Sequence, residues 1–360
     1  MIIEHKEEEI LSIINTVKSF KENNYKIISY NQTKDPKVAF ITPVFNQANY
    51  LSSFIASVQN QKLKDYELIF IDDFSLDNSY RFILEQKKID KRIKVIKNKK
   101  NMGALYSRYI GQKMAYAKFS IFVDCDDMLL EDGVFQSYNH IIKYDLDIVQ
   151  FVSIWQTRNS IALNTNTYNY KRIIYKSILH YIFYYDYFKK GAVLNVVLWD
   201  KLVKTKIMNK AFEFIGYSYL KKNIIINNDN IVSYSIFQMA NSYQHINGIG
   251  YFYIENNEKS AHNSWRDKKK GNKIIKSFFL NIQFFYEKSN DTYLDKLYCI
   301  HRIKRYFKKY KNLFINLNKS EYYFIKTLID KILNLNYLSK QDKLFLTKIE
   351  LFILTMKKNS

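Results

Sequence analysis

Three carboxylates follow closely after an apolar run near the middle of the chain. Residues 120–123 predict a buried strand, and Asp124, Asp126 and Asp127 come directly after it. Carboxylates this close repel one another, so they are rarely placed at the end of a buried strand without a cation. Hard divalent ions such as Mg²⁺ and Mn²⁺ prefer oxygen ligands, and they often share these with a substrate phosphate. The triplet therefore predicts metal-assisted chemistry on a phosphorylated substrate; the alternative is an acidic turn that caps a helix starting near Glu131.

The composition describes a globular chain with a basic surface. Its 360 residues fit one large or two modest domains, and a hydrophobic content of 47% supports a packed core. The 56 Lys and Arg against 34 Asp and Glu give a net charge of +22. Because the lysines are spread along the chain, we interpret this charge as a solvated surface, and nucleic acid is not an expected partner.

The use of cysteine and the length of the apolar runs indicate where in the cell the protein is located. Cys125 lies inside the acidic motif, so pairing with Cys299 is not expected, and a reducing compartment follows. The first ten residues are acidic and lack the apolar run of a secretory signal. No window approaches 18 uninterrupted apolar residues. The sequence predicts a cytoplasmic protein, with a peripheral position at a membrane surface as a further expectation.

The hydrophobic pattern changes twice along the chain. Residues 1–36 have helical apolar spacing, and from Lys37 short apolar runs alternate with helix-like stretches. Strands are expected at 38–42, 68–71, 93–96, 120–123 and 148–152, and helices near 50–60, 77–88, 104–117 and 131–143. This alternation predicts an α/β fold with a mostly parallel central sheet flanked by helices. Further along, 194–203 and 250–254 favour strands or buried segments, 229–240 favours a helix, and 266–360 reads as a basic helical extension.

Four polar clusters share one position, directly after a predicted strand or in the loop that follows. They are Pro43-Val44-Phe45-Asn46-Gln47, Asp72-Asp73-Phe74-Ser75, Asn101-Met102-Gly103 with the helix that carries Arg108, and the acidic triplet. In open α/β sheets, ligands bind outside the carboxyl ends of the strands. We therefore expect the four clusters to converge on one ligand site.

The residue types in these clusters have complementary chemistry. Phe45 could lie against a base or ribose, and Asp72 or Asp73 could accept a hydrogen bond from a base N–H. Arg108 could face a pyrophosphate, which suits its planar fork. Each has a plainer alternative: a core position for Phe45, a helix N-cap for Asp73 and a surface ion pair for Arg108.

These segments also carry a family resemblance. In order, ITPVFNQANYLSSFIASVQNQ, YELIFIDDFSLDNS, NMGALYSRYIG and FVDCDDMLLEDG resemble the amino-terminal half of family 2 glycosyltransferases, which have the A-type nucleotide-sugar-binding fold. The resemblance covers about 37–152, and a weaker one continues at 199–202, 228–230 and 250–253. It implies a catalytic domain over 37–265, in which 37–152 bind the nucleotide sugar and 153–265 form the acceptor side.

The resemblance implies an inverting, hexosyltransferase-type transfer from a nucleoside-diphosphate sugar to an acceptor hydroxyl. The donor would be a UDP-sugar by family frequency, and the acceptor a glycan, lipid or protein. The residues implied to bind the donor are Pro43, Phe45, Asn46, Asp72, Asp73, Arg108 and Asp124. Asp126, with help from Asp124, would hold Mn²⁺ or Mg²⁺ as a Lewis acid.

Four further residues complete this hypothesis. The family usually has a Glu-Asp pair whose Asp is the catalytic base; here Asn228 replaces the Glu, and Asp229 remains as the candidate base. His262 could add a metal or phosphate contact, or it could be an exposed loop histidine. Trp199 could shape an acceptor pocket, or it could fill the core.

Two other functions stay open. Asp124-Cys125-Asp126 has the spacing of haloacid-dehalogenase-type phosphatases, with Asp124 as nucleophile, although Asp127-Met128 stands where Gly and then Thr or Val are usual. A non-catalytic protein could instead use the positive charge and the helical tail to bind a polyanion or a membrane. For the tail itself, apolar spacing beside many lysines predicts peripheral contact with an anionic membrane.

Overall fold

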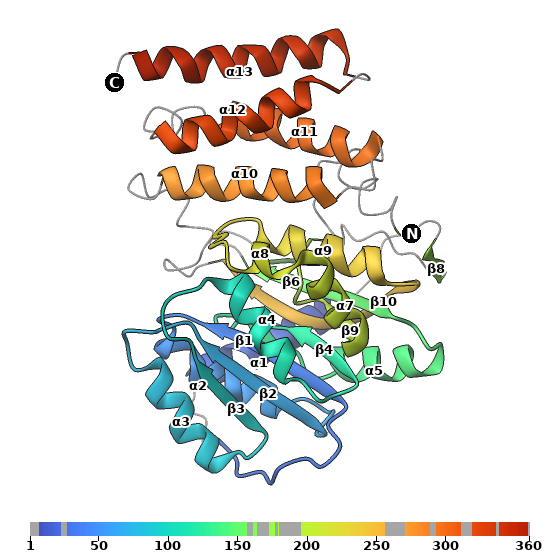
Figure 1. The fold of residues 1–360 in the computed structure, drawn as a ribbon. Coiled ribbons are helices and arrows are strands. Elements are labelled where there is room, and N and C mark those ends of the chain that lie inside the picture. The colour runs from blue at the N-terminus through green and yellow to red at the C-terminus, as the bar shows by residue number, and fades with distance from the viewer. Residues whose placement is uncertain are drawn as a thin grey trace. The chain divides into compact units, whose positions relative to one another are not determined.

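The structure is a computed structural model, and it is described here in two compact units. The described residues are 7–22, 27–156, 161–163, 173–176, 179, 196–255, 271–288, 293–310, 319–335 and 338–358. One unit comprises Met1–Asn223 with Val232–Asn257, and the other comprises Ile224–Ile231 with Glu258–Ser360 (Figure 1). The predicted domain boundaries at residues 36 and 265 remain predictions.

The first unit is built on a sheet with ten strands among the described residues. Four parallel strands begin it, in the order β3-β2-β1-β4: these are β1 (Val38–Val44), β2 (Tyr66–Asp72), β3 (Ile93–Lys97) and β4 (Phe119–Phe122). Because the four run parallel, the loops that follow them leave the sheet at the same edge. This arrangement confirms the predicted α/β fold with a mostly parallel sheet.

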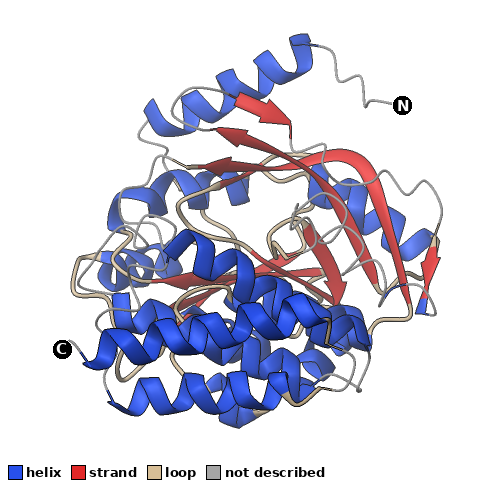
Figure 2. Ribbon diagram, turned by 90° about the horizontal axis from the view of Figure 1, so that it is seen from above, coloured by secondary structure: helices blue, strands red, loops and turns tan. Residues whose placement is uncertain are grey.

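The rest of the sheet mixes strand directions. β9 (Lys201–Lys204) is antiparallel to both β4 and β6 (Ile148–Gln156). β10 (Ser242–Ile254) runs parallel to β6, and the short β5 (Met128–Leu129) pairs antiparallel with β10. Two further short strands, β7 (Ile161–Leu163) and β8 (Ile174–Tyr175), pair with β6 and β10. The resulting sheet is twisted and curled (Figure 2).

Helices cover both faces of this sheet. The helices of the first unit are α1 (Glu7–Glu22), α2 (Ala48–Gln59), α3 (Ser79–Ile89), α4 (Ala104–Met114), α5 (Gly133–Lys143), α7 (Thr205–Ile215) and α8 (Tyr217–Leu220); α9 (Asn228–Met239) begins in the second unit and ends in the first. α2, α3 and α5 pack against buried rings such as Phe40, Phe70 and Phe119. α4 packs on the other face, where a Cβ at Gly111 would lie 2.4 Å from Ile41 and 2.5 Å from Ile71. Glycine therefore permits the close approach of α4 to β1 and β2.

The sequence missed parts of the second half of this sheet. β10 begins at Ser242, eight residues before the expected strand, and its register with β6 shifts between His245 and Ile249 and again by Tyr251. β5 has only two residues, too few for any periodicity to show. Cys125 and Cys299 are each buried, one in each unit, and each is a free thiol in this structure.

The second unit contains four long helices among its described residues. They are α10 (Gly271–Lys288), α11 (Tyr293–Tyr310), α12 (Lys319–Leu333) and α13 (Lys340–Lys358). α10 contacts α11 and α12, and α13 contacts the same two helices, so the four surround one core. The Phe278 and Tyr306 rings stack there with centroids 3.7 Å apart. The helical extension predicted from the sequence is confirmed, and among the described residues no helix is both long and apolar enough to span a bilayer.

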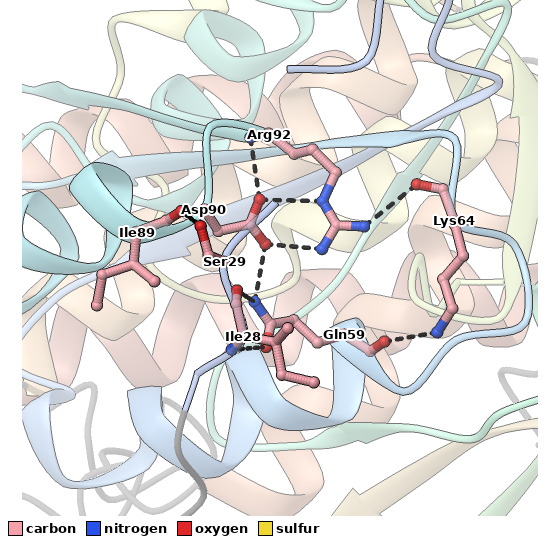
Figure 3. A network of polar contacts seen from close by, with 7 residues as sticks. All are labelled: Ile28, Ser29, Gln59, Lys64, Ile89, Asp90 and Arg92. Carbon is pink, nitrogen blue, oxygen red and sulfur yellow. Dashed lines mark hydrogen bonds and ion pairs between the residues drawn. The ribbon is translucent and has the colours of Figure 1, made fainter. Parts of the chain in front are cut away.

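A buried ion pair joins several elements of the first unit (Figure 3). The Arg92 guanidinium donates two hydrogen bonds to the Asp90 carboxylate, at 3.0 and 2.7 Å, and both side chains are at most 2% exposed. Gln59 donates to Asp90 at 2.8 Å, and Arg92 donates to the Lys64 carbonyl at 3.2 Å. The pair therefore connects the end of α2, the start of β3 and the loop between α2 and β2.

The same network holds the segment that leads into β1. Gln59 exchanges two hydrogen bonds of 2.9 Å with the Ile28 backbone, and Ser29 donates to the Ile89 carbonyl at 3.2 Å (Figure 3). The Arg92 guanidinium also lies 3.5 Å from the centroid of the Tyr30 ring. The segment is thus held by hydrogen bonds from Gln59 and Ser29 and by a cation–π contact with Arg92.

Replacing Arg92 should destabilise the first unit strongly. Arg92→Met leaves the Asp90 carboxylate buried without its cation, which typically costs about 3–5 kcal/mol. Arg81→Met is the matched control, because Arg81 pairs with Glu85 at the surface, where its side chain is 80% exposed, and such pairs contribute about 0–1 kcal/mol. Urea unfolding followed by circular dichroism measures both, and equal midpoints for the two variants would contradict the prediction.

Candidate active site

The first two polar clusters are tied to each other by hydrogen bonds between their loops. The Asn46 side chain accepts from the Leu76 N–H at 2.8 Å, and the Asn46 N–H donates to Ser75 Oγ at 3.0 Å. The Gln47 N–H donates to Ser79 Oγ at 2.9 Å. These bonds hold the loop after β1 against the loop after β2, so both clusters face the carboxyl edge of the sheet together. Asn46 thus has a definite positional role.

Two phenylalanine side chains in these loops are exposed to solvent. Phe45 is 43% exposed and Phe74 is 41% exposed, whereas Pro43 is half-buried within β1. Phe74 has a φ of +67°, a left-handed conformation that is costly for a bulky side chain and occurs most often at functional sites. The Lys97 ammonium lies 5.8 Å from the Phe74 ring and 3.8 Å from Asp72 Oδ2. Sequence reasoning assigned no role to Phe74 or Lys97, although Phe74 lies within a quoted motif.

Asp72 and Asp73 are adjacent in sequence but differ in their hydrogen bonding. Asp72 is fully buried at the end of β2, where its Oδ2 accepts from the Ser75 N–H at 3.2 Å. Its Oδ1 is also buried and accepts no hydrogen bond from the residues that the structure describes. An unsatisfied buried acceptor costs about 1–3 kcal/mol, so Asp72 retains the capacity to bind a donor.

Asp73 instead organises the third cluster. Its carboxylate accepts from the Asn98 side chain and the Met102 N–H, each at 2.8 Å, and from the Gly103 N–H at 2.7 Å. Gly103 has a φ of +88°, and a Cβ there would lie 2.6 Å from Asn223 Oδ1, so this position requires glycine. Asp73 therefore sets the start of α4 and with it the direction of that helix.

A hydrogen bond between Arg108 and Asp124 links the third predicted cluster to the acidic triplet. Arg108 projects from the second turn of α4 and donates from Nη2 to Asp124 Oδ1 at 3.1 Å. The Arg108 side chain is 6% exposed, and the Asp124 side chain is 36% exposed. A buried cation thus lies beside a carboxylate that still reaches solvent, directly at the end of β4.

Asp127 points away from this pair into the protein. Tyr251 donates its hydroxyl proton to Asp127 Oδ2 at 2.8 Å, and the Ile254 N–H donates to Oδ1 at 2.8 Å. The Tyr251 oxygen also accepts the Asp124 N–H at 3.2 Å. Burial, followed by the charges of Asp126 and Asp124, raises the pKa of the Asp127 carboxyl well above its ordinary value. Asp127 is therefore a clamp between the acidic turn and β10.

Asp126 borders a cavity of about 290 Å³ lined by residues of α1, α2, the acidic turn and β10. The cavity is lined by Lys21, Asn49, Tyr50, Ser53, Cys125, Asp126, Asp127, Met128 and Ile254. Within the described part of the chain, no group of three or more His, Cys, Asp or Glu is arranged to hold a metal ion. A magnesium-type ion needs only one or two carboxylates when a substrate diphosphate supplies the other oxygens, so Asp124 and Asp126 fit that donor set.

Trp199 lies in an aromatic stack behind the acidic turn. It is 5% exposed, and its ring lies 4.5 Å from that of Tyr251 and 5.9 Å from that of Tyr253, both nearly parallel to it. Trp155 packs 4.9 Å from Tyr253, and these two rings are only half-buried. The outer surface of the stack is therefore formed by Trp155 and Tyr253. The alternation of Tyr251 and Tyr253 along a strand was the available signal for them.

The remaining predicted residues fall elsewhere. Asn228 and Asp229 form the start of α9 and belong to the second unit, with Asp229 in the first helical turn. His262 lies outside the described residues. The structure thus brings Phe45, Asp72, Arg108, Asp124 and Asp126 to one edge of the sheet. The roles of Asp229 and His262 remain predictions.

Comparison with known proteins identifies the family of this sheet domain. Residues 39–196 match the model of the family described as Glycosyl transferase family 2. The cholesterol galactosyltransferase of Borreliella burgdorferi is 29% identical over 223 residues, which cover 60% of this chain and 59% of that protein. The Staphylococcus aureus poly(ribitol-phosphate) beta-N-acetylglucosaminyltransferase TarP is 39% identical over 117 residues, 31% of this chain and 35% of that protein.

A solved structure supports the same fold. The crystal structure of S. aureus TarS 1–349 in complex with UDP-GlcNAc superposes with a TM-score of 0.60 at 13% sequence identity, covering 89% of each chain. The chain carries a family 2 glycosyltransferase domain with the A-type fold, which confirms the resemblance read from the four motifs. The matched segment spans less than two thirds of the curated relatives; for the glycosyltransferase GlyA of Streptococcus pneumoniae it is 29%.

Removing the Tyr251 hydroxyl should lower the affinity for the donor more than it lowers the stability of the fold. Tyr251→Phe keeps the ring stacked on Trp199 but frees both Asp127 and the Asp124 N–H, so the acidic turn loses its fixed geometry. We expect about a tenfold loss of donor affinity, which corresponds to roughly one hydrogen bond of 1–1.5 kcal/mol. Binding of a nucleoside diphosphate with Mn²⁺ by isothermal titration calorimetry measures it.

Tyr243→Phe is the matched control for this prediction. The Tyr243 hydroxyl is also buried, but it lies near the start of β10, eight residues before Tyr251, and donates to Gln150 of β6 at 2.7 Å. We expect it to lower the melting temperature without changing donor affinity. If both variants lost affinity equally, the clamp would have no specific role.

Proposed function

We propose that this protein is an inverting glycosyltransferase that moves a sugar from a UDP-sugar to an acceptor hydroxyl. The observation that carries the proposal is the Arg108–Asp124 pair beside Asp126, at the edge where the loop after β1 exposes Phe45 and the buried Asp72 ends β2. A UDP-linked donor agrees with the UDP-GlcNAc in the TarS structure. The family assignment offers no support for the phosphatase hypothesis.

The nucleotide would bind over the ends of β1 and β2. The exposed Phe45 ring supplies an apolar surface for a base or ribose, and Phe74 supplies a second ring from the neighbouring loop. Asp72 Oδ1, which has no partner among the described residues, would accept a hydrogen bond from a base N–H. Pro43 and Asn46 would act by shaping this loop, and Asp73 by holding the start of α4.

The diphosphate would lie between Arg108 and the acidic turn. A bidentate guanidinium suits phosphate oxygens, so Arg108 can exchange its bond with Asp124 for bonds to the diphosphate. Asp124 and Asp126 would hold Mn²⁺ or Mg²⁺, which when bound neutralises the negative charge that develops on the leaving group. The Asp127 clamp keeps a third carboxylate out of this arrangement.

Transfer requires a base for the acceptor hydroxyl. Asp229 would accept that proton while the acceptor oxygen bonds to the anomeric carbon, and the bond to the diphosphate oxygen breaks with its electron pair. Asp229 occupies the first turn of α9, where the helix dipole stabilises a negative charge. Asn228 cannot take a proton at neutral pH, so the role falls on Asp229 alone. His262 remains a candidate for a further phosphate or metal contact.

The acceptor would be a glycan, lipid or protein hydroxyl. Because Trp199 is buried, its contribution to an acceptor pocket would be indirect, through the half-buried Trp155 and Tyr253 that stack around it. Aromatic faces of this kind suit the apolar face of a sugar ring. We therefore propose that a sugar unit of the acceptor lies against these two rings.

Donor binding should depend on Asp126 and on the metal together. Thermal melting with UDP, GDP, dTDP and CMP, each with and without Mn²⁺, should show a metal-dependent rise with UDP, because a ligand that binds the native state stabilises it by mass action. Asp126→Asn should abolish that rise. Asp132→Asn is the control, since Asp132 lies in the same segment but pairs with Lys62 at the surface. A rise that survives in Asp126→Asn would refute the assignment of this carboxylate.

Asp229→Asn should separate binding from transfer. The amide keeps the shape but cannot take a proton, so kcat should fall by about 10²–10⁴-fold. The melting shift with UDP and Mn²⁺ should stay unchanged, because the donor contacts are intact. Sugar transfer to a hydroxyl acceptor, followed by UDP release, measures the first quantity. Retention of wild-type kcat would assign the base to another residue.

A further inference from the structure

The positive charge of the chain is concentrated in its carboxyl-terminal part. Residues 258–360 contain 23 Lys and Arg against 9 Asp and Glu, a net charge of +14 out of the total of +22. The remaining 257 residues carry only the other +8. The carboxyl-terminal part that includes α10 to α13 therefore carries most of the net positive charge.

One face of α13 combines this charge with exposed leucines. Between residues 340 and 351, the exposed positions are Lys340, Gln341, Lys343, Leu344, Thr347, Lys348 and Leu351. Leu344 is 57% exposed and Leu351 is 55% exposed, and a spacing of seven places them two turns apart on one side of the helix. Lys343 and Lys348 flank this stripe on opposite sides.

The carboxylates of α13 are directed away from that face. Asp342 pairs with Lys304 of α11, and Glu350 pairs with Lys326 of α12 at 3.0 Å. Their side chains are only 17% and 19% exposed. The exposed face between 340 and 351 therefore presents cations and leucines without a compensating anion.

The opposite face of the same helix fills the bundle core. Leu346 is fully buried and Ile349 is 1% exposed, and the Phe345 ring packs against Phe307 of α11. The exposed leucines are thus not needed to hold α13 in place. Leu344 and Leu351 therefore add an apolar surface on the side of α13 that faces away from the bundle core.

We infer that the Lys340–Leu351 face of α13 binds the surface of an anionic membrane. Two leucines can enter the boundary between headgroups and acyl chains while the surrounding ammonium groups meet lipid phosphates. A purely polar polyanion would use the lysines and leave the leucines in water. The combination therefore favours a lipid surface, and the inference does not depend on the proposed transferase activity.

Flotation of the full chain with vesicles tests this. We expect the protein to float with phosphatidylcholine vesicles that contain phosphatidylglycerol, to remain unbound with phosphatidylcholine alone, and to bind less as salt rises. Neutralising Lys340, Lys343 and Lys348 to Gln should lower the partition coefficient on the order of a hundredfold at low salt. Leu344→Ser with Leu351→Ser should lower it at least about tenfold.

A matched charge control lies in the first unit. Changing the exposed Lys87, Lys88 and Lys91 to Gln removes the same three charges from α3 and the turn after it. This triple should retain most of the binding, and all variants should melt like the wild type because every changed side chain is exposed. Absence of flotation in the wild type, or equal losses from the two lysine triples, would overturn the inference. Unchanged binding in the leucine variant would also overturn it, and would indicate a soluble polyanion instead.

Discussion

The hydrogen bonds of Tyr251 fix the geometry on which the candidate site depends. One phenol oxygen accepts the Asp124 N–H and donates its proton to Asp127, so both ends of the acidic turn are bound to a rigid strand. Stacking on Trp199 fixes the ring itself. Because Asp127 is held inside, the repulsion among three clustered carboxylates is divided: one is paired with donors in the core, and two stay at the edge of the sheet. A cation-binding turn needs that division, since three free carboxylates would repel each other out of position.

A second constraint is a series of contacts that connects the loop after β2, helix α4 and the acidic turn. Asp73 holds the start of α4, Gly111 lets α4 approach the sheet closely, and Arg108 is thereby delivered to Asp124. The first step rests on a buried carboxylate that accepts three hydrogen bonds, which makes the start of α4 specific as well as stable. The strained Phe74 and the unsatisfied Asp72 Oδ1 both lie where the nucleotide is proposed to bind. Strain and an open acceptor at one place are typical of a ligand site.

The sequence was sufficient to predict the fold, for a physical reason. Parallel strands are continuous apolar runs, and the polar residues that end them must meet at one edge, so the convergence of four clusters followed from local patterns. The division of labour among neighbouring carboxylates did not follow. Asp127 resembles Asp126 in sequence, and only its contact with Tyr251, 124 residues away, distinguishes a clamp from a ligand. The same holds for Asp73, whose donors come from a loop about 30 residues further along.

Burial offers a general way to separate positional from reactive acids in such motifs. A buried acid whose two oxygens both accept hydrogen bonds from protein donors contributes to geometry, and its removal should disturb affinity and stability together. An acid that is partly exposed, or that keeps one acceptor unsatisfied, can gain new interactions when a ligand arrives. By this criterion Asp73 and Asp127 are positional, whereas Asp72 and Asp124 retain capacity for a ligand. In this acidic motif the number of carboxylates therefore exceeds the number that could take part in binding a ligand, because Asp127 is held by donors in the interior.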